Sequence, residues 1–574
     1  MFHCGHAFFS KHYLRAMKYI FFLLLISVKV LAQNPYPQNY FRNPLNIPIL
    51  LAGNFGECRP GHFHSGIDIK TEGKENLPVF AAADGYISRV KMEPGGFGHG
   101  IYITHPNGYT TLYAHLNDLF PELQKLIRKE QYAQKSWTLD LHFTPEKFPI
   151  KKGQQIAWSG NTGGSSAPHL HFEIRDSKTE HPLNPQLFGF KTEDNIAPLP
   201  TEVAIYDAAE SIYIQKPTRL KLKKVKDIFV PLKDSVIVWT DDINIGVAVN
   251  DYMNNSTNTL SFYTARWYAD EKLIGTLTLD DIGYDETRYM NACADYKLQK
   301  ETGIWFNSLF LLPNNQLTKL YQLEQGGNGK IVLSNDEPTA IRIVMTDVSG
   351  NISQIKFRLI KGKKMIPSLC NNKWKSKAPN IFETPNLKFS LPATALYDDI
   401  CFETSKSAEA KSSSSRFSIA TSTIPVHNYF DLSIKPEVAT PFALTSKMTL
   451  QYSDGKKISG KKATLNDGWY SASVRAFGDY WLAVDTVAPT IKPLLKNGVV
   501  LGGKKEIRFV VTDNFSSVKT FTGTINGQWL CFEQHGNNWF YRLDEYCPKG
   551  KNKLQLSAID ENGNERKMQF DFTR

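Results

Sequence analysis

Histidine is concentrated in one part of the sequence, where its spacing is compatible with metal or acid–base chemistry. Of the 14 histidines, nine lie between residues 62 and 181. Three motifs occur there in order: HSGID at 64–68, YAHL at 113–116 and HLHFE at 169–173. Each motif alone is also typical of structural histidines. The hypothesis of a site therefore depends on whether the fold brings the three together.

Strand alternation predicts how these side chains point, since successive residues face opposite sides of a strand. His169 and His171 then share one face, and His64 and Asp68, four residues apart on an extended segment, share another. The buried face opposite the first pair comprises Leu170, Phe172 and Ile174. A third polar face is expected from Tyr109, Thr111, Tyr113 and His115. Three strands are thus predicted to converge polar groups on one cleft.

The residue types in this cleft suit zinc. Neutral imidazoles with one carboxylate and no thiolate are typical of a zinc site that keeps a fourth position open for water. Such a centre lowers the pKa of bound water to roughly 7 and polarises a carbonyl. The remaining histidines can take or give a proton and stabilise an oxyanion. Alternation does not decide which of His169 and His171 binds the metal.

Short strands with glycine-rich turns must position these residues, so residues 51–190 are predicted to be β-dominated, with Pro106-Asn107-Gly108 as a hairpin turn. Residues 118–137 depart from this pattern, because leucines and an isoleucine at helical spacing predict an inserted helix and a loop to about residue 147. The predicted strands cover residues 79–83, 85–90, 101–104, 109–115, 155–159 and 169–175.

Five segments of this region resemble the lysostaphin-type zinc metallopeptidases of family M23, also called LytM-domain or peptidoglycan DD-endopeptidase-like proteins. They read RPGHFHSGIDIKT, VFAAADGYISRV, GYTTLYAHL, IKKGQQIAWSGNTGGSSAPHLHFEIR and PLNPQLF, and span about residues 50–190. The resemblance implies Zn2+ bound by His64, Asp68 and His171, with His115 and His169 as catalytic histidines. It also implies hydrolysis of peptidoglycan peptide bonds. The insertion at 118–147 is longer than the family's usual connection, which leaves its effect on substrate range open.

Further residues near these motifs are candidates for supporting or groove positions: Tyr113, Glu173, His62 and Asn161. Glu173 shares a face with His171, so it is expected to orient that ring, to act as a base or to lie at the surface. Tyr113 either donates to an oxyanion or packs. The turn Asn161-Thr162-Gly163-Gly164 lacks the lysine of a phosphate-binding loop, which favours a tight turn beside His169. His62 and His99 are interpreted as groove or structural residues.

The rest of the chain is predicted to consist of β modules. Residues 247–251 resemble 509–513, and 347–351 resemble 560–564, with a strand followed by a D-x-x-G-N turn in both copies. This pattern resembles bacterial immunoglobulin-like sandwich modules. Residues 404–416, TSKSAEAKSSSSR, are predicted to be a low-complexity loop with nothing to bury.

The predicted fold class is mainly β: an M23/LytM-type β-sheet catalytic domain with an inserted helix, followed by tandem β-sandwich modules. A length of 574 residues exceeds one hydrophobic core. The predicted divisions are a signal peptide at 1–32 with Met17 as an alternative start, a lead segment at 33–50, the peptidase-like domain at 51–195, an immunoglobulin-like sandwich with an insertion at 196–362, a β-rich module at 363–485 and a second immunoglobulin-like sandwich at 486–574.

Residues 17–32, MKYIFFLLLISVKVLA, are typical of a secretory signal, with an apolar core shorter than the ~20 residues of a membrane span. An uncleaved anchor is the alternative. Loss of residues 1–32 removes Lys11, Arg15, Lys18 and Lys29, so the net charge falls from +11 to +7. That surface suits an anionic polymer and lacks the compact basic stripe of nucleic-acid-binding proteins.

Six cysteines remain after residue 32, and an exported protein can oxidise them. Cys531 and Cys547 are the one pair predicted to form a bridge, because they lie close in one expected hairpin. No C-x-x-C pair occurs, which argues against zinc held by thiolates.

Together these patterns predict an exported zinc metalloendopeptidase of the periplasm or cell envelope that hydrolyses peptide bonds in peptidoglycan stem peptides or cross-links. Expected partners are peptidoglycan peptides and proteins bound through the C-terminal modules, without nucleic acid and without a membrane span after signal cleavage. One alternative is a non-catalytic peptidoglycan-binding or regulatory protein that uses the same groove. Another is a structural or adhesive surface protein whose function lies in the sandwich modules.

Overall fold

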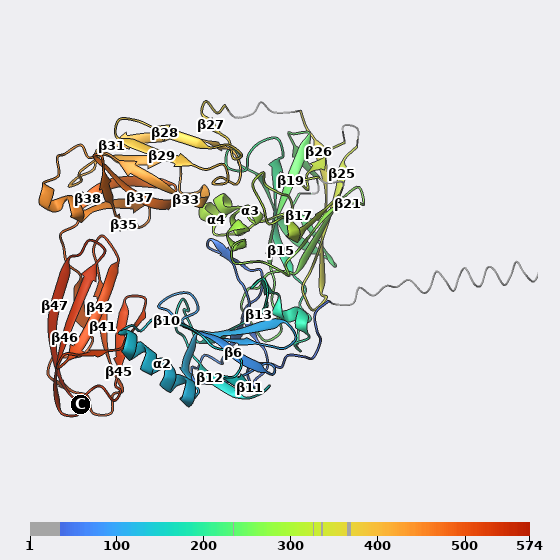
Figure 1. The fold of residues 1–574 in the computed structure, drawn as a ribbon. Coiled ribbons are helices and arrows are strands. Elements are labelled where there is room, and N and C mark those ends of the chain that lie inside the picture. Colours follow the sequence, from blue (N-terminus) through green and yellow to red (C-terminus); the bar gives the residue numbers. More distant parts are fainter. Residues whose placement is uncertain (1–34, 234, 325–326, 335–336, 364–368) are drawn as a thin grey trace, which may run out of the picture.

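The computed structural model describes residues 35–574 apart from 234, 325–326, 335–336 and 364–368. The predicted signal segment therefore lies outside the described residues. The chain is built mainly of strands, in four β-sheet units that follow one another around a closed circuit (Figure 1). The last unit, drawn in red, returns to the side of the first, drawn in blue and cyan. Across the described ranges, no helix has the length and apolar composition needed to cross a bilayer.

The first unit contains the sheet that carries the three motifs. Its path runs through β1 (Leu51–Gly53), β4 (Ile67–Lys70), β13 (His169–Asp176), β8 (Tyr109–Ala114), β7 (His99–Thr104), β6 (Gly85–Met92) and β10 (Leu139–His142), with β11 (Pro149–Ile150) beside β6 and β14 (Pro182–Leu183) beside β13. A smaller sheet of β5 (Pro78–Phe80), β12 (Gln155–Ser159) and β9 (Leu116–Leu119), a hairpin of β2 (Cys58–Arg59) and β3 (His62–Phe63), and the 3-10 helix η1 (Pro185–Phe188) complete the unit.

Strand register places the candidate residues opposite one another. His171 on β13 pairs with Asp68 on β4 and with Ala114 on β8. The opposite face of β13 is apolar, as the alternation predicted, since Leu170 and Phe172 are 0% exposed and belong to the core of this unit. A slip of one residue would turn both histidines of β13 into that core, so the apolar face fixes the register.

The predicted strands of this region are present, with differences at their ends. The turn at 106–108 joins β7 to β8, and Gly108 takes the φ of +86° that suits such a turn. The predicted strand 79–83 is shorter, because β5 ends at Phe80. The next residues are buried, but their backbone groups bond outside any ladder, with the N–H of Ala81 donating to the carbonyl of Gln154.

The insertion is part helix and part strand. Its helix α2 (Pro121–Gln134) has proline in its first turn, where the missing N–H costs little, and ends at Lys135 in the left-handed conformation. The predicted loop to residue 147 is partly wrong, because β10 pairs with β6 residue by residue. Leu139 of β10 joins the core of the unit. Four residues are too short for strand alternation to be distinguished from a loop in sequence.

The second unit contains one large sheet with short helices. Its path runs through β22 (Asn307–Ser308), β19 (Asp242–Asn250), β15 (Leu199–Asp207), β16 (Thr218–Val225), β17 (Ile228–Pro231), β26 (Ile352–Lys361), β25 (Thr339–Thr346), β20 (Thr264–Ala269), β21 (Lys272–Thr278) and β23 (Tyr321–Leu323), with β18 (Ser235–Val238) beside β26 and β24 (Ile331–Val332) beside β19. The helices are η2 (Thr287–Tyr289), α3 (Met290–Cys293), α4 (Tyr296–Thr302) and η3 (Thr318–Leu320).

The third and fourth units each consist of two main sheets. The third contains β28 (Asn380–Glu383), β29 (Leu387–Leu391), β33 (Pro425–Ile434), β37 (Trp469–Ala476) and β36 (Thr464–Asn466) in one sheet, β31 (Thr404–Ser407), β32 (Arg416–Ile419), β38 (Gly478–Val484), β34 (Met448–Ser453) and β35 (Ile458–Lys462) in the other, the pair β27 (Lys373–Trp374) and β30 (Ile400–Cys401), and η5 (Phe442–Lys447). The fourth contains β39 (Thr490–Pro493), β41 (Glu506–Thr512), β45 (Asn538–Arg542) and β44 (Phe532–His535) against β40 (Val499–Val500), β47 (Glu565–Thr573), β46 (Lys551–Asp560), β42 (Val518–Ile525) and β43 (Gln528–Leu530).

The two D-x-x-G-N turns have the same hydrogen bonds. In each, the asparagine donates its backbone N–H and its side-chain amide to the two oxygens of the aspartate, Asn351 to Asp347 and Asn564 to Asp560. The turns join β25 to β26 and β46 to β47. The sequence similarity therefore reflects one hairpin that occurs twice.

Two predictions about these units are wrong. Cys531 and Cys547 are free thiols, and the disulfide joins Cys370 to Cys401. Cys547 packs into the apolar core of the fourth unit, whereas Cys531 lies outside that core. The serine-rich segment also has structure, since its first residues form β31 and the buried hydroxyl of Ser414 accepts a hydrogen bond from the backbone of the facing strand β38. Serine hydroxyls bonding to backbone are not visible in composition alone.

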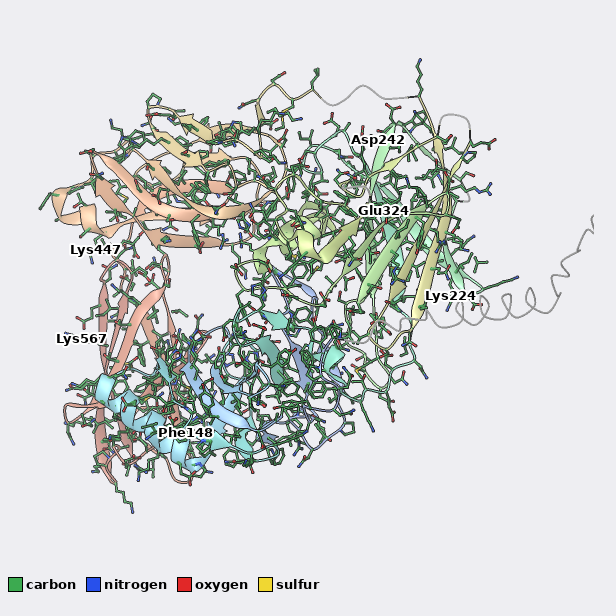
Figure 2. The ribbon with its side chains drawn as sticks, turned by 45° about the vertical axis from the view of Figure 1, so that its right-hand side comes forward. Phe148, Lys224, Asp242, Glu324, Lys447 and Lys567 are labelled. Carbon is green, nitrogen blue, oxygen red and sulfur yellow. A yellow bond between two sulfur atoms is a disulfide. The ribbon has the colours of Figure 1, made fainter. Side chains whose placement is uncertain are left out.

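The fourth unit docks on the insertion of the first. Tyr132 on α2 stacks on Tyr546 with ring centroids 3.7 Å apart, and its hydroxyl donates to Asp544. Arg542 on β45 forms an ion pair of 3.1 Å with Asp118. Figures 1 and 2 both show α2 beside this unit, and the labels Phe148 and Lys567 mark the two sides in Figure 2.

Candidate metal centre

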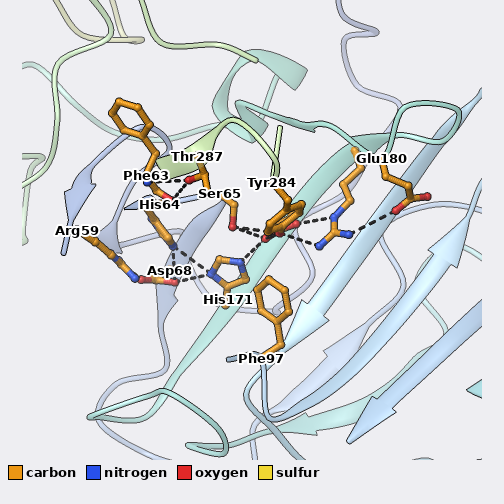
Figure 3. A network of polar contacts seen from close by, with 12 residues as sticks. Arg59, Phe63, His64, Ser65, Asp68, Phe97, His171, Glu180, Tyr284 and Thr287 are labelled. Atoms are coloured by element: carbon orange, nitrogen blue, oxygen red, sulfur yellow. Dashed lines mark hydrogen bonds and ion pairs between the residues drawn. The ribbon is translucent and has the colours of Figure 1, made fainter. Parts of the chain in front are cut away.

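Three side chains converge on one point at the end of β4 and β13 (Figure 3). Oδ1 of Asp68 lies 3.1 Å from Nε2 of His64 and 2.9 Å from Nδ1 of His171, and these two nitrogens are 3.1 Å apart. All three side chains are buried. Two ligand atoms each about 2.1 Å from a tetrahedral zinc ion lie roughly 3.4 Å apart. The three atoms are therefore spaced much like a metal-binding set.

The outer ring nitrogens of both histidines already have acceptors. Nδ1 of His64 donates to the carbonyl oxygen of Asn54 at 2.8 Å, and Nε2 of His171 donates to Glu173 at 2.9 Å. In the neutral tautomers that these bonds select, both inner nitrogens present lone pairs. Two lone pairs and a carboxylate oxygen that face one another require a cation between them. The donor set thus fits a bound metal ion.

Asp68 is held in its ionised form. Its second oxygen accepts a hydrogen bond of 2.6 Å from Nη2 of Arg59. Burial raises the pKa of Asp68, but the neighbouring imidazoles of His64, His169 and His171 outweigh burial and hold the pKa well below its usual range. Burial lowers the pKa of His171, whereas its bonds to Asp68 and Glu173 raise that pKa to about 9. The surrounding carboxylates therefore favour positive charge at this point.

Glu173 supports His171 from behind, and a residue of the second unit completes its environment. The glutamate is 0% exposed, so the surface alternative is wrong. Its carboxylate accepts hydrogen bonds from Nε of Arg175 at 2.7 Å, from the hydroxyl of Ser65 at 2.5 Å and from the hydroxyl of Tyr284 at 2.6 Å. Burial raises the pKa of Glu173, but Arg175 and these bonds lower it to about 2. Glu173 therefore stays ionised and orients His171.

His115 and His169 lie beside the cluster, with ring centroids 4.7 Å apart. Nδ1 of His115 donates to the carbonyl oxygen of Thr162 at 2.8 Å, and Nδ1 of His169 donates to that of Ala167 at 2.8 Å. Nε2 of His169 lies 3.3 Å from Oδ1 of Asp68. Burial and the charges of His171 and His169 lower the pKa of His115 to about 3. His115 is therefore a neutral imidazole, and its bond to Thr162 leaves the lone pair on Nε2.

His115 reaches the cluster through a break in strand alternation. β8 ends at Ala114, and His115 takes a left-handed φ of +59°. The expected polar face along this strand is therefore wrong for Tyr113, which is fully buried beside Phe172 and accepts a hydrogen bond from the backbone N–H of Ala82. Tyr113 packs in the core, and the left-handed residue turns the histidine to the opposite side.

The other candidates lie around the cluster. His62 is exposed, and its Nδ1 lies 3.3 Å from the carbonyl oxygen of Pro60. Asn161 lies in the glycine-rich turn, and within the described chain its buried Oδ1 has no hydrogen-bond partner. Nδ1 of His99 donates to the carbonyl oxygen of Asn117, as in a structural role.

Several positioning residues were not identified from sequence. The turn beside His169 was predicted, but not the use of its Thr162 carbonyl to hold His115. This turn packs so closely that a Cβ on Gly163 would lie 2.3 Å from the backbone nitrogen of Gly98. Tyr284 follows Glu173 by 111 residues and belongs to another unit, so no local pattern connects them. Arg59 was not singled out from sequence; it follows the half-buried acid Glu57 by two residues, and their side chains lie 3.5 Å apart.

Comparisons with known proteins match the region that carries these residues. The model of peptidase family M23 matches residues 62–137 and 141–185, and the model of a Zu5-like domain matches residues 371–485. An uncharacterized metalloprotease of Haemophilus influenzae is 33% identical over 135 residues, which cover 23% of this chain and 22% of that protein. The DD-carboxypeptidase/endopeptidase Mpg of Neisseria meningitidis is 34% identical over 131 residues, 23% of this chain and 24% of that protein.

A third relative is named as an activator of hydrolases and not as a peptidase. The murein hydrolase activator NlpD of Salmonella typhimurium is 35% identical over 131 residues, 23% of this chain and 27% of that protein. Among solved structures, the catalytic domain of lysostaphin from Staphylococcus simulans is 24% identical and covers 27% of this chain and 92% of that chain, with a TM-score of 0.17. The matched region thus spans about a quarter of the curated relatives. Residues 62–137 and 141–185 of this chain thus match peptidase family M23, and β-sheet modules follow them.

Proposed function

We propose that this chain is an exported zinc metalloendopeptidase that hydrolyses peptide bonds in peptidoglycan stem peptides or cross-links. The single observation that carries the proposal is the set of five converging side chains in which each histidine has its outer nitrogen bonded elsewhere. The family match and the printed names of two relatives, a metalloprotease and a DD-carboxypeptidase/endopeptidase, support the class of reaction.

In this proposal His64, Asp68 and His171 hold the zinc ion. When bound, zinc supplies Lewis-acid polarisation of the peptide carbonyl and lowers the pKa of a water molecule. Histidine and carboxylate ligands without thiolate suit a site that retains an open position.

The chain's own residues move the protons. Nε2 of His115 accepts a proton from the attacking water, because the bond of its Nδ1–H to Thr162 leaves the lone pair on Nε2. His169, fixed at Ala167 in the same tautomer, is the second acid–base group: its Nε2 takes a proton from solvent and donates it to the departing amine, while His115 returns the proton of the water to solvent. Glu173 fixes the ring of His171 and does not titrate near neutral pH.

A second candidate function is that of a non-catalytic regulator of other murein hydrolases. The relative named murein hydrolase activator favours it as an alternative. The presence of all five side chains, each with a supporting contact, favours hydrolysis instead. Export is part of the proposal through residues 17–32, and a mature protein beginning at Gln33 in the cell envelope is its expected product.

The test uses purified residues 33–574. We expect about one zinc ion per chain and release of soluble fragments from purified murein that stops on addition of a chelator and resumes with zinc. Mass spectrometry of the fragments then identifies the bond. Digestion by His171→Ala at the wild-type rate would contradict the mechanism, and full zinc content without any release would favour the regulatory alternative.

A further inference from the structure

A cavity of about 640 Å³ lies where three parts of the chain meet. Its walls come from α4 and the residues around α3 in the second unit, from β33 and β37 in the third, and from Pro60 and Gly61 in the β2–β3 hairpin of the first. Figure 1 shows α3 and α4 facing β33, with the blue hairpin below them. Cavities of this size between units are common binding sites for small ligands.

The charge of the lining is strongly one-sided. Four cations line the cavity, and Glu301 is the one acidic residue among its described lining: the cations are Arg288, Lys300, Lys456 and Arg475. Over the described part of the chain, none of the four forms an ion pair with a carboxylate within 4 Å. Asp454, whose carboxylate accepts hydrogen bonds from the backbone N–H groups of Lys456 and Lys457, is an acidic neighbour. Burial and the charge of Arg475 lower the pKa of Arg288. Two arginines that repel each other at a cavity wall favour an anion.

Backbone carbonyl groups hold the guanidinium groups of Arg288 and Arg475 in place, and N–H donors remain on each. Nε and Nη2 of Arg288 donate to the carbonyl oxygen of Val426, and Nε of Arg475 donates to that of His427. A guanidinium carries five N–H groups, so further donors remain on each for a ligand. A Cβ on Gly61 would lie 3.3 Å from Nη1 of Arg288, so the glycine lets the hairpin approach this guanidinium closely.

One wall of the cavity also holds an acceptor without a donor. Asn291 is 1% exposed, and its Oδ1 has no hydrogen-bond partner in the described structure. An unpaired buried carbonyl oxygen costs free energy of desolvation, about 1–3 kcal/mol. A ligand N–H that reached it would recover this cost. The cavity therefore combines donors for an oxyanion with an acceptor for an amide.

We propose that this cavity binds a carboxylate-bearing peptide, with the carboxylate at Arg288 and Arg475 and a peptide N–H at Asn291. The choice of a peptide over a free anion follows from the unpaired amide oxygen. The β2–β3 hairpin forms one wall, and Arg59 on its first strand bonds to Asp68 of the metal cluster. The site thus lies one hairpin from the metal centre, and the assignment of murein stem peptide as the ligand depends on the proposed function.

The test measures binding by calorimetry in the His115→Ala background, with and without a zinc chelator. The probes are the murein stem peptide with free carboxylates, the same peptide with its carboxylates amidated, and inorganic phosphate. We expect chelator-insensitive binding of the free peptide, at least tenfold weaker binding after amidation, and phosphate binding weaker than that of the peptide.

Variants locate the site. Arg475→Gln is expected to weaken binding of the free peptide about tenfold or more. Because Arg475 also supports the backbone, Lys300→Gln combined with Lys456→Gln is the second variant; both lysines are exposed, and a loss of several-fold is expected. Lys462→Gln, an exposed cation of β35 outside the cavity, is the control and should bind as the parent does.

Equal affinity for the free and amidated peptides, tighter binding of phosphate than of peptide, or parent-like binding by both cavity variants would overturn the proposal. Its failure is distinguishable from failure of the proposed function. Murein release by the wild type with amidation-insensitive binding refutes only the cavity, and carboxylate-dependent binding without murein release refutes only the hydrolase.

Discussion

The second and fourth units both contact the first unit, but they contact different parts of it. Tyr284 of the second unit donates to Glu173, which in turn holds His171. The fourth unit instead packs on the insertion through Tyr132, at contacts that do not include the metal cluster. The contact of the second unit supports the candidate metal ligand His171. The contact of the fourth unit joins the last unit of the chain to the first. The first unit, if cut out at residue 195, would lose both contacts.

Glu173→Gln tests the contact that supports His171. Among the variants of the two contacts, it is expected to have the largest effect on zinc affinity. Removal of the charge weakens the hold on His171 and leaves Arg175 without its buried partner. Zinc affinity should fall about 10- to 100-fold, measured by competition with a chromogenic chelator. Glu180→Gln is the control, since this exposed carboxylate reaches Arg175 from outside. Wild-type affinity in Glu173→Gln would show that the contact does not orient the ligand.

Tyr284→Phe tests whether the second unit takes part in the site. The variant loses hydrogen bonds to Glu173 and Arg175 but keeps the ring. Because it acts through Glu173, zinc affinity should fall less than in Glu173→Gln, about threefold to tenfold. Tyr268→Phe in the same unit is the matched control. If both phenylalanine variants bind zinc equally well, the second unit only shields this side.

Tyr132→Ala tests the docking side. Loss of the stack on Tyr546 and of the bond to Asp544 should cost about 1–2 kcal/mol of docking free energy. We expect a larger radius of gyration in X-ray scattering with zinc content unchanged. Glu122→Ala on the same helix should scatter like the wild type. Zinc loss in Tyr132→Ala would instead show that both contacts support the metal centre.

His427→Asn is expected to have the smallest effect, a change in how the stability of the fold depends on pH. Burial and the charges of Arg475 and Arg288 lower the pKa of His427 to about 4, whereas in the unfolded chain the pKa is about 6.5. The unfolded chain therefore binds more protons between these values, and stability falls as the pH drops from 6.5 towards 4. The variant should lose less stability over this window in urea unfolding followed by tryptophan fluorescence. If the pH dependence of stability is unchanged in the variant, other titrating groups cause the loss of stability at acidic pH.

The sequence predicted those parts of the site that follow from local rules. Alternation placed Leu170 and Phe172 in the core and therefore both histidines of β13 on the open face. It failed for Tyr113, because the left-handed backbone of His115 reverses the alternation after the strand. No rule about residue types signals that reversal in advance.

Long-range contacts account for the rest. Tyr284 and the docking of Tyr132 on the fourth unit join segments 111 and 412 residues apart in sequence. Similarly, the predicted bridge of Cys531 with Cys547 relied on proximity in sequence, while the observed disulfide spans 31 residues. Local spacing in the sequence predicts which side of a strand a residue faces and where turns occur. The contacts between units depend instead on how the units are arranged around one another.

The central claim is that a metal-holding set and a separate proton-transferring histidine act together. The most direct measurement compares zinc content and murein release in wild type and His115→Ala. His115 bonds to Thr162 rather than to the inner atoms of the cluster, so the variant should retain about one zinc ion per chain and lose release at least about 100-fold. Release at the wild-type rate by zinc-loaded His115→Ala would contradict the account.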